Sequence, residues 1–308
     1  MTWWTDDSPI PDPEGKGARA VSFIQKLRLH EGKLAGQRFS LARWQRRIVQ
    51  RIYGDTREDG RRRIRTVFIL LPRGNGKTTL CAGLGLLHLT GPEKEAGGQV
   101  IVAAADREQA SIAYNAASGM IAQEPVLKQR TKVLPSYKTI QHAGSRSTFK
   151  AISHEAYSKH GLSISCLIAD EVHAWPKREL WDVLRQSMGK REEPLTIVIT
   201  TAGSGVHGLA HELYDYARKV ASGEVEDETF LPILFEAPKD ADWQDEAVWQ
   251  AVNPAIAADA NVGCLILTGA GDKAFIAGAD IAEMATKTPL EARAYAELGQ
   301  ECASLLET

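Results

Sequence analysis

A chain of 308 residues, 44% hydrophobic and 25% charged, has the composition of an ordinary globular protein and can bury one large core or two smaller ones. Its formal net charge of −2 excludes binding of nucleic acid through overall charge, and no apolar run approaches the roughly 20 residues of a membrane-spanning helix. The start, MTWWTDDSPIPDPEGKG, lacks the basic beginning and apolar centre of a secretory signal. Together these features predict a cytoplasmic protein with no membrane partner.

The cysteines are spread along the chain, with no CxxC pair and no nearby pair of histidines. This spacing predicts neither a zinc site nor a disulfide framework. The four are Cys81, Cys166, Cys264 and Cys302.

The first part of the chain divides into an arm and a helical region. Residues 1–17 are rich in Pro, Gly and Asp, which predicts a flexible arm. Helical spacing runs from Ala18 to Tyr53 with an interruption near Gly32 to Ser40. Basic residues outnumber acids between Lys16 and Arg65, which is typical either of a positive face for phosphates or of a solvated helix followed by an arginine-rich turn.

Strand and helix patterns then alternate. The strand pattern RTVFILL ends at Pro72 and is followed by the helix pattern KTTLCAGLGLLHL. The later predicted strands are 99–105, 163–171 and 194–203, and the later predicted helices are 106–123, 177–190 and 207–222. Because these strands are apolar throughout, they predict an α/β fold whose mostly parallel sheet lies between helices, with ligands at the carboxyl ends of the strands.

The stretch LPRGNGKTTL falls at such a strand end. Gly74, Asn75 and Gly76 allow backbone angles that turn successive N–H groups toward an anion, and the helix that begins near Lys77 adds its positive dipole end. Lys77 then reaches the β and γ phosphates, and the Thr78 hydroxyl binds magnesium. The usual phosphate loop has glycine where Leu71 stands, so a plain strand-to-helix turn remains an alternative.

Two further strand ends carry polar groups. In CLIADE, Asp170 is predicted to hold magnesium and Glu171 to polarise the attacking water, the alternative being two solvated acids. In TIVITTAG, the hydroxyls of Thr200 and Thr201 are placed to sense the γ phosphate, although threonine is also common in strands for packing reasons.

The motifs RFSLARWQRRI, LPRGNGKTT, ADREQA, CLIADEVHAW and TIVITTAG, in this order, resemble the ATPase domain of large terminase subunits, the motors that package DNA into tailed-bacteriophage heads. The resemblance covers residues 18–254. It implies an ASCE-type P-loop NTPase fold, Mg²⁺-dependent ATP hydrolysis and movement of double-stranded DNA held by its phosphate backbone. It also implies a homo-oligomeric ring that works with a phage portal and a small terminase subunit. In that family a glycine-poor phosphate loop is normal.

The resemblance also implies roles for individual residues. Phe39, Trp44 and Gln45 match the adenine-recognition segment, and Asp170 and Glu171 match the metal-binding and catalytic acids. Arg107 is the candidate for the arginine that acts on a neighbouring subunit, with Arg146 as the second candidate. The nucleotide contacts implied by the matching motifs are Arg73, Gly74, Asn75, Gly76, Lys77, Thr78, Thr79, Thr200 and Thr201.

Residues 255–308 depart from this family. Terminases continue past the segment matching WQAVNPAI into a nuclease domain, whereas this chain continues into a short strand, a glycine-rich loop and a helix that resemble crotonases, the enoyl-CoA hydratase family. We therefore expect the nuclease domain to be absent. The segment AFIAGADI implies that the Ala279 N–H matches one oxyanion donor. Glu283 and Glu291 are not at the matching catalytic positions, so lyase activity is not expected.

Two functions follow as alternatives from the sequence. The first is the ATP-hydrolysing, DNA-translocating domain. The second is a non-catalytic chimera that binds a nucleotide or an acyl-CoA without turning it over. The abrupt change near residue 255 is compatible with a natural, an engineered or an artefactual fusion.

Overall fold

The computed structural model describes residues 3–153, 161–202, 208–238, 241–242 and 245–255, all within one compact unit, Met1–Asp259. The predicted crotonase-like fragment, including Ala279, lies outside these residues. The strand end that includes Gly203 is described only as far as residue 202.

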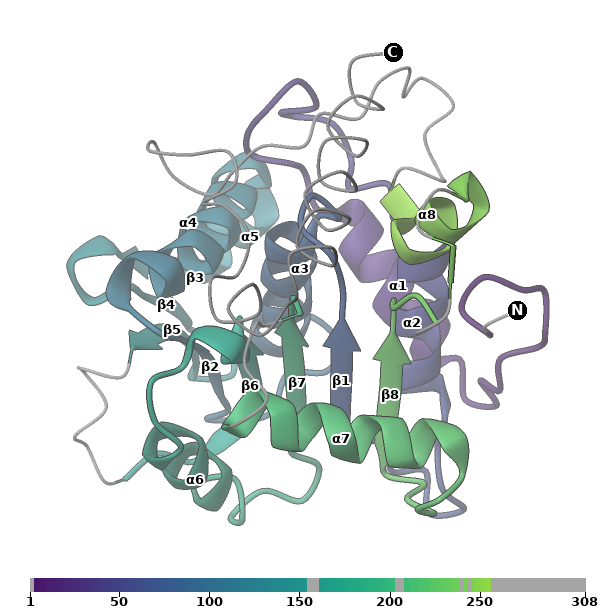
Figure 1. Ribbon diagram of the computed structural model, residues 1–308. Coiled ribbons are helices and arrows are strands. Elements are labelled where there is room, and N and C mark those ends of the chain that lie inside the picture. The colour runs from purple at the N-terminus through teal and green to yellow at the C-terminus, as the bar shows by residue number, and fades with distance from the viewer. Residues whose placement is uncertain (1–2, 154–160, 203–207, 239–240, 243–244, 256–308) are drawn as a thin grey trace, which may run out of the picture. The chain divides into compact units, whose positions relative to one another are not determined.

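The strands of the described ranges form one eight-stranded sheet in the order β3-β4-β5-β2-β6-β7-β1-β8 (Figure 1). The strands from β5 to β8 in this order are parallel, while β3 and β4 add an antiparallel extension at one edge. Their bounds are β1 Thr66–Leu70, β2 Gln99–Ala104, β3 Thr131–Leu134, β4 Thr139–His142, β5 Ser147–Ser153, β6 Ile164–Asp170, β7 Leu195–Thr200 and β8 Phe230–Leu234.

One strand, β7, separates the phosphate-loop strand β1 from the acid-bearing strand β6. The predicted fold class, a mostly parallel sheet between helices, is confirmed.

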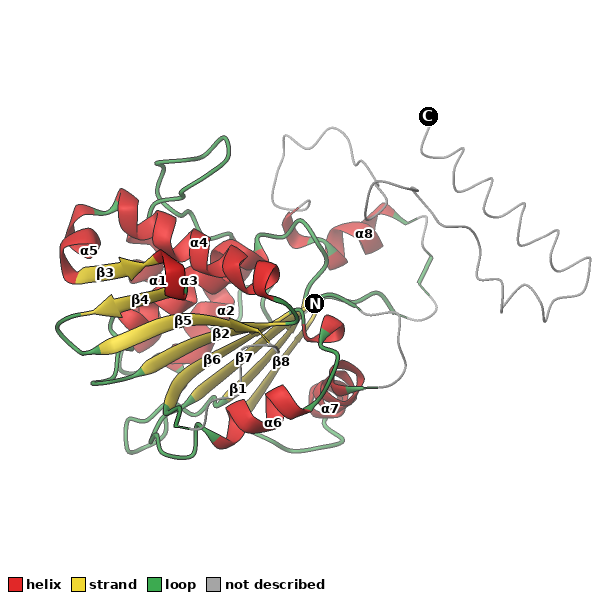
Figure 2. Ribbon diagram, turned by 90° about the vertical axis from the view of Figure 1, so that its left-hand side faces the viewer, coloured by secondary structure: helices red, strands yellow, loops and turns green. Residues whose placement is uncertain are grey.

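Helices cover both faces of the sheet (Figure 2). On one face lie α1 (Lys16–Lys26), α2 (Arg43–Gly54), α3 (Lys77–Leu89) and α4 (Arg107–Gln123), and on the other lie α6 (Glu179–Gln186) and α7 (Leu209–Ser222). The remaining short helices are α5 (Pro125–Arg130), η1 (Pro135–Tyr137), η3 (Val172–Ala174) and α8 (Glu246–Val252). Among the described helices, none has both the length and the apolar character needed to cross a membrane.

Alternation along the strands explains the two cores. In β1, Val67 and Ile69 pack with the face that carries α1 to α4, whereas Phe68 and Leu70 pack with the face that carries α6 and α7. Successive side chains of a strand point to opposite faces, so a strand covered on both sides must be apolar at every position. This is why the strand pattern was continuous rather than alternating.

The loose arm predicted for residues 1–17 is, over residues 3–15, a segment packed against α2. Trp4 is buried, and its ring lies 5.5 Å from that of Phe235. Arg47 of α2 donates from Nε to the Trp3 carbonyl at 2.8 Å and pairs with Asp6 at 3.0 Å. α1 already begins at Lys16.

Candidate functional site

Three neighbouring strands bring the predicted polar groups to one edge of the sheet. β1, β7 and β6 are parallel, with Leu70 opposite Thr200 and Asp170 opposite Ile199. The carboxyl ends of parallel strands meet at the same edge. The phosphate loop after β1, the acids at the end of β6 and the threonines at the end of β7 therefore lie together (Figure 1).

The phosphate loop depends on two left-handed glycines. Gly74 has φ +82° and Gly76 has φ +70°, a region that L side chains rarely adopt. Gly76 is the residue before α3, so the loop leads straight into the free N–H groups of the helix start. Backbone N–H groups and the positive end of the helix dipole at this place favour a phosphate.

The Asn75 side chain holds the phosphate loop through hydrogen bonds to the loop backbone. Its side chain is only 4% exposed, and Nδ2 donates to the carbonyls of Pro72 and Arg73, both at 3.2 Å. Its Oδ1 accepts from the N–H of Ala255 at 2.8 Å. One buried amide thus fixes the loop and also joins it to the segment that follows α8.

Lys77, the first residue of α3, points back across this edge. Its ammonium lies 2.8 Å from Glu171 Oε1 and donates to the Leu71 carbonyl at 3.3 Å. The residue is 9% exposed, so its charge is compensated by these two acceptors. The structure therefore brings together the cation of the loop and the predicted catalytic acid.

Glu171 is held by three elements at once. Its backbone is left-handed at φ +48°, which is uncommon outside glycine, and its N–H donates to Ile199 of β7. Its Oε2 accepts from the backbone N–H of Thr201 at 2.9 Å and from the Thr201 hydroxyl at 3.1 Å. Burial disfavours the charge, but the hydrogen bonds from Lys77 and Thr201 outweigh burial and lower the pKa of Glu171. The Glu171 carboxylate is thus ionised, and its orientation is fixed by these hydrogen bonds.

The pKa of Asp170 is shifted in the direction opposite to that of Glu171. It is 8% exposed, and burial, assisted by the Glu171 charge, raises the pKa of Asp170 to about 6. Its backbone carbonyl accepts from the Trp175 indole N–H at 2.9 Å, which fixes the end of β6. Two adjacent carboxyls with pKa values shifted in opposite directions are typical of a functional site.

The sequence interpretation missed His173. Its Nδ1 lies 3.1 Å from Glu171 Oε2, 3.0 Å from the Thr200 hydroxyl and 3.4 Å from the Thr201 hydroxyl. It therefore links the acid of β6 to both threonines of β7. The signal available in the sequence was its place two residues after the acid pair in ADEVHAW.

The predicted magnesium ligands, Asp170 and Thr78, are both oxygen donors, the kind that Mg²⁺ prefers. Among the described residues there is no cluster of three or more His, Cys, Asp or Glu. Mg²⁺ commonly uses only one or two carboxylates and completes its shell with water and substrate phosphates. A buried carboxyl with a raised pKa, such as Asp170, also gains from a nearby cation.

The predicted adenine residues are all buried, and Gln45 lies beside the phosphate loop. Gln45 accepts from the Ala42 N–H at 3.0 Å, and its Nε2 would lie 3.7 Å from a Cβ added at Gly76. Phe39 and Trp44 are both buried, and the Trp44 ring meets Phe235 at 5.3 Å. Stacking of either ring on a base stays a prediction.

The arginine candidates lie apart from Lys77 and Glu171. Arg107 is exposed at the start of α4 and lines a separate pocket beside β5. Arg146 is exposed in the turn before β5. It lies at the amino end of that strand, opposite to the sheet edge that carries Lys77 and Glu171. Arg73 is exposed in the loop itself. None of these placements puts a second cation on Glu171.

Over most of its length the chain is similar to large terminase subunits. The family model described as "Terminase large subunit, ATPase domain" matches residues 43–219, more than half of the chain. The large terminase subunit of Enterobacteria phage HK97 is 33% identical over 244 residues, which cover 78% of this chain and 46% of that protein. The crystal structure of the HK97 large terminase superimposes with a TM-score of 0.69 and 30% identity, covering 79% of this chain and 48% of that one.

A short similarity to a different protein also exists. Crotonyl-CoA hydratase of Syntrophomonas wolfei is 51% identical over 49 residues, which cover 16% of this chain and 19% of that protein. The chain spans about half the length of the HK97 relatives.

Proposed function

The chain belongs to the family of terminase large subunit ATPase domains, and we propose that it hydrolyses Mg·ATP at the edge formed by β1, β6 and β7. The observation that carries this proposal is the 2.8 Å contact between the Lys77 ammonium and the Glu171 carboxylate, groups from two different strand ends. A loop that binds phosphate and an acid that activates water must lie together for hydrolysis.

The proposed reaction is mainly one of positioning and charge. Lys77 exchanges its contact with Glu171 for the β and γ phosphates, while the N–H groups after Gly74 bind the same oxygens. Glu171, released from Lys77 but still held by Thr201 and His173, accepts a hydrogen bond from the attacking water. A magnesium ion bound by Asp170 and Thr78 would neutralise charge on the phosphates. Thr200 and Thr201 respond to the γ phosphate through the same network.

The proposal extends to the work that the ATP supports. Hydrolysis drives movement of double-stranded DNA, held by its phosphate backbone, in a cytoplasmic ring of identical subunits on a phage portal with a small terminase subunit. Arg107 is the proposed arginine that acts on a neighbouring subunit's nucleotide, with Arg146 as the second candidate. The support is family membership and the exposed position of both side chains.

Phosphate release, measured with and without duplex DNA, tests the proposal. We expect Glu171→Gln to lower hydrolysis by about 10²-fold or more, since a positioned base contributes about that much. Lys77→Ala should lose hydrolysis as well. Glu224→Gln, an exposed acid after α7, is the matched control and should retain the wild-type rate. Unchanged hydrolysis in both site variants would refute the assignment. A wild-type chain that binds nucleotide without turnover would support the non-catalytic alternative.

Residues 255–308 carry a second, smaller proposal. The 49-residue similarity to crotonyl-CoA hydratase supports a crotonase-like origin of this part, with the Ala279 N–H as a single oxyanion donor. An oxyanion hole needs two donors, so we expect no hydration of crotonyl-CoA.

A further inference from the structure

A pocket of about 240 Å³ opens at the carboxyl ends of β2 and β5. Its walls come from three elements: Arg107 begins α4 directly beyond β2, Lys138 follows η1, and Lys150 lies on β5. The Ala151 N–H donates to the Lys138 carbonyl at 3.1 Å and fixes the turn against the strand. The basic side chains are thus carried by a rigid frame.

The lining of this pocket has one sign of charge. It contains three basic residues and no acid, and hydroxyl-bearing residues complete its polar part: Ser111, Ser136, Tyr137 and Ser153. In the described part of the chain, no carboxylate forms an ion pair with Arg107, Lys138 or Lys150 (the ion pairs involve other residues). In a protein whose net charge is −2, uncompensated cations around one hollow select an anion.

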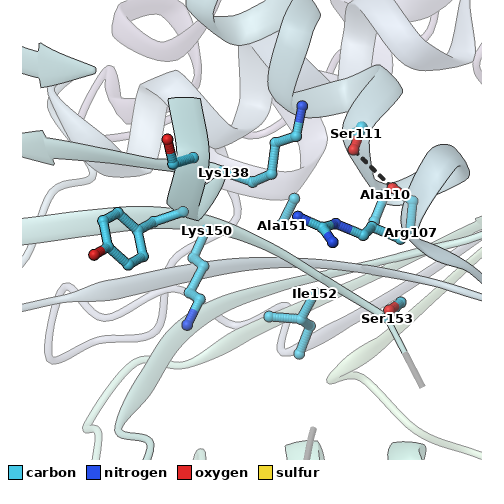
Figure 3. Close-up of a pocket in the computed structure, with 10 residues that line it drawn as sticks. Arg107, Ala110, Ser111, Lys138, Lys150, Ala151, Ile152 and Ser153 are labelled. Carbon is cyan, nitrogen blue, oxygen red and sulfur yellow. Dashed lines mark hydrogen bonds between the residues drawn. The ribbon is translucent and has the colours of Figure 1, made fainter. Parts of the chain in front are cut away.

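The cations are spread rather than convergent. Figure 3 shows the Arg107 guanidinium near Ala151, while the ends of Lys138 and Lys150 point to opposite sides of it. The Lys138 ammonium lies 5.4 Å from the centroid of the Tyr114 ring. The lining also has no glycine, in contrast to the phosphate loop, which wraps one anion with backbone N–H groups. Spread side-chain charges suit an extended polyanion better than one compact phosphate.

This pocket is separate from the nucleotide site. In the sheet order, β6 and β7 lie between β2 and β1, so β2 and β1 are about 14 Å apart at the usual strand spacing. Both sites nevertheless open at the same edge of the sheet. A ligand bound here is therefore distinct from the nucleotide proposed to bind at Lys77.

We propose that Lys138 and Lys150 bind successive backbone phosphates of duplex DNA. The inference rests on the proposed function, in which the chain moves DNA. The contacts assigned to Lys138 and Lys150 are with phosphate oxygens, which carry no information on the base sequence. The pocket therefore contributes contacts that position DNA without reading its sequence.

The test is the salt dependence of binding of a labelled duplex DNA by the full chain, followed by fluorescence anisotropy. The variants are Lys150→Ala and Lys138→Asn, because asparagine tolerates the left-handed backbone of Lys138 at φ +46°. Each should weaken binding several-fold and lower the slope of log K against log salt by about 1. Lys219→Ala on α7, on the other face of the sheet, is the matched control and should retain the wild-type slope.

Hydrolysis without DNA, measured in parallel, separates this inference from the proposed function. Lys150→Ala and Lys138→Asn should keep the DNA-free rate, whereas Lys77→Ala should lose hydrolysis and keep DNA binding. Wild-type affinity and slope in both pocket variants would overturn the inference. So would a loss of affinity for a fluorescent ATP analogue in place of DNA, since the pocket would then serve a nucleotide. An equal loss in Lys219→Ala would show that no particular pocket is involved.

Discussion

Glu171 owes its orientation to side chains that do not react. The Thr201 N–H and hydroxyl hold one carboxylate oxygen, and His173 reaches the same oxygen at 3.1 Å while also contacting Thr200. A carboxylate fixed in this way needs little reorganisation when water is activated. The threonines at the end of β7 and the acid at the end of β6 therefore form one unit.

His173→Ala should lower kcat by about tenfold while KM for ATP changes little, because it loosens Glu171 without touching the phosphate loop. Steady-state kinetics of phosphate release measure both constants. His211→Ala, a half-buried histidine on α7 that pairs with Asp215, is the control. A rise in KM alone would place His173 in ATP binding instead.

A buried histidine of α3, His88, makes stability depend on pH. His88 is 3% exposed with its Nε2 2.9 Å from the Tyr53 hydroxyl, and burial lowers its pKa from 6.5 to about 3. The unfolded chain therefore binds a proton that the folded one does not, between pH 6.5 and 3. The stability of the neutral form is fully present above pH 6.5 and is lost as pH falls toward 3.

From pH 7 to pH 5 the wild type should lose about 2 kcal/mol more of its unfolding free energy than His88→Gln, at about 1.4 kcal/mol per pH unit below 6.5. Urea unfolding at the two pH values measures the difference. Parallel losses in the two proteins would show that His88 is protonated in the folded state.

At the scale of elements, the glycines of α3 allow this helix to pack closely against its neighbours. A Cβ added at Gly85 would lie 2.3 Å from Cε2 of Phe149, a fully buried residue of β5. At Gly83 the nearest atoms are the Ile24 Cγ2 at 3.3 Å and the Phe39 Cε1 at 3.4 Å. The same helix thus offers one position that cannot take a methyl group and one that is merely tight.

Gly85→Ala should destabilise the protein by about 1–3 kcal/mol through overpacking, although alanine favours helix. Gly83→Ala should be close to neutral, because the helix propensity gained offsets a small shift of side-chain ends. Chemical unfolding of both variants checks this. Equal effects would mean that α3 does not pack on Phe149 as described.

The elements that the sequence predicted are those with strong local patterns. The predicted strand 65–71 corresponds to β1, and the predicted helix 77–89 to α3, because glycine and proline bound both. β8 was missed because Pro232 interrupts its pattern, yet β8 is an edge strand, where proline is tolerated. β3, β4 and β5 were also missed, since the polar residues of the first two carry no continuous apolar run.

The functional site was also predictable only where the local sequence pattern is strong. The meeting of Lys77, Glu171 and Thr201 was predictable. Glu171 and Thr201 directly follow buried strands, Lys77 begins the helix after the glycine loop, and parallel strands bring these ends to one edge of the sheet. The buried state of Phe39 and Trp44 was not predictable, because it depends on partners from distant segments such as Phe235. The Asn75 contact with Ala255 likewise joins residues 180 positions apart.

For the whole molecule, the phosphate loop is also a structural junction. Asn75 lies between the loop backbone and the segment after α8, so a change in the loop reaches the end of the described domain through one amide.

The most direct test of the central claim is titration of the protein with a non-hydrolysable ATP analogue, with and without Mg²⁺. Lys77→Ala should lose about tenfold or more in affinity, as expected for a charge-assisted hydrogen bond to phosphate. Asp170→Asn should lose only the gain in affinity that Mg²⁺ gives, and Lys219→Ala should match the wild type. Equal affinities and an equal Mg²⁺ effect in all four proteins would contradict a nucleotide site between the phosphate loop and the acids of β6.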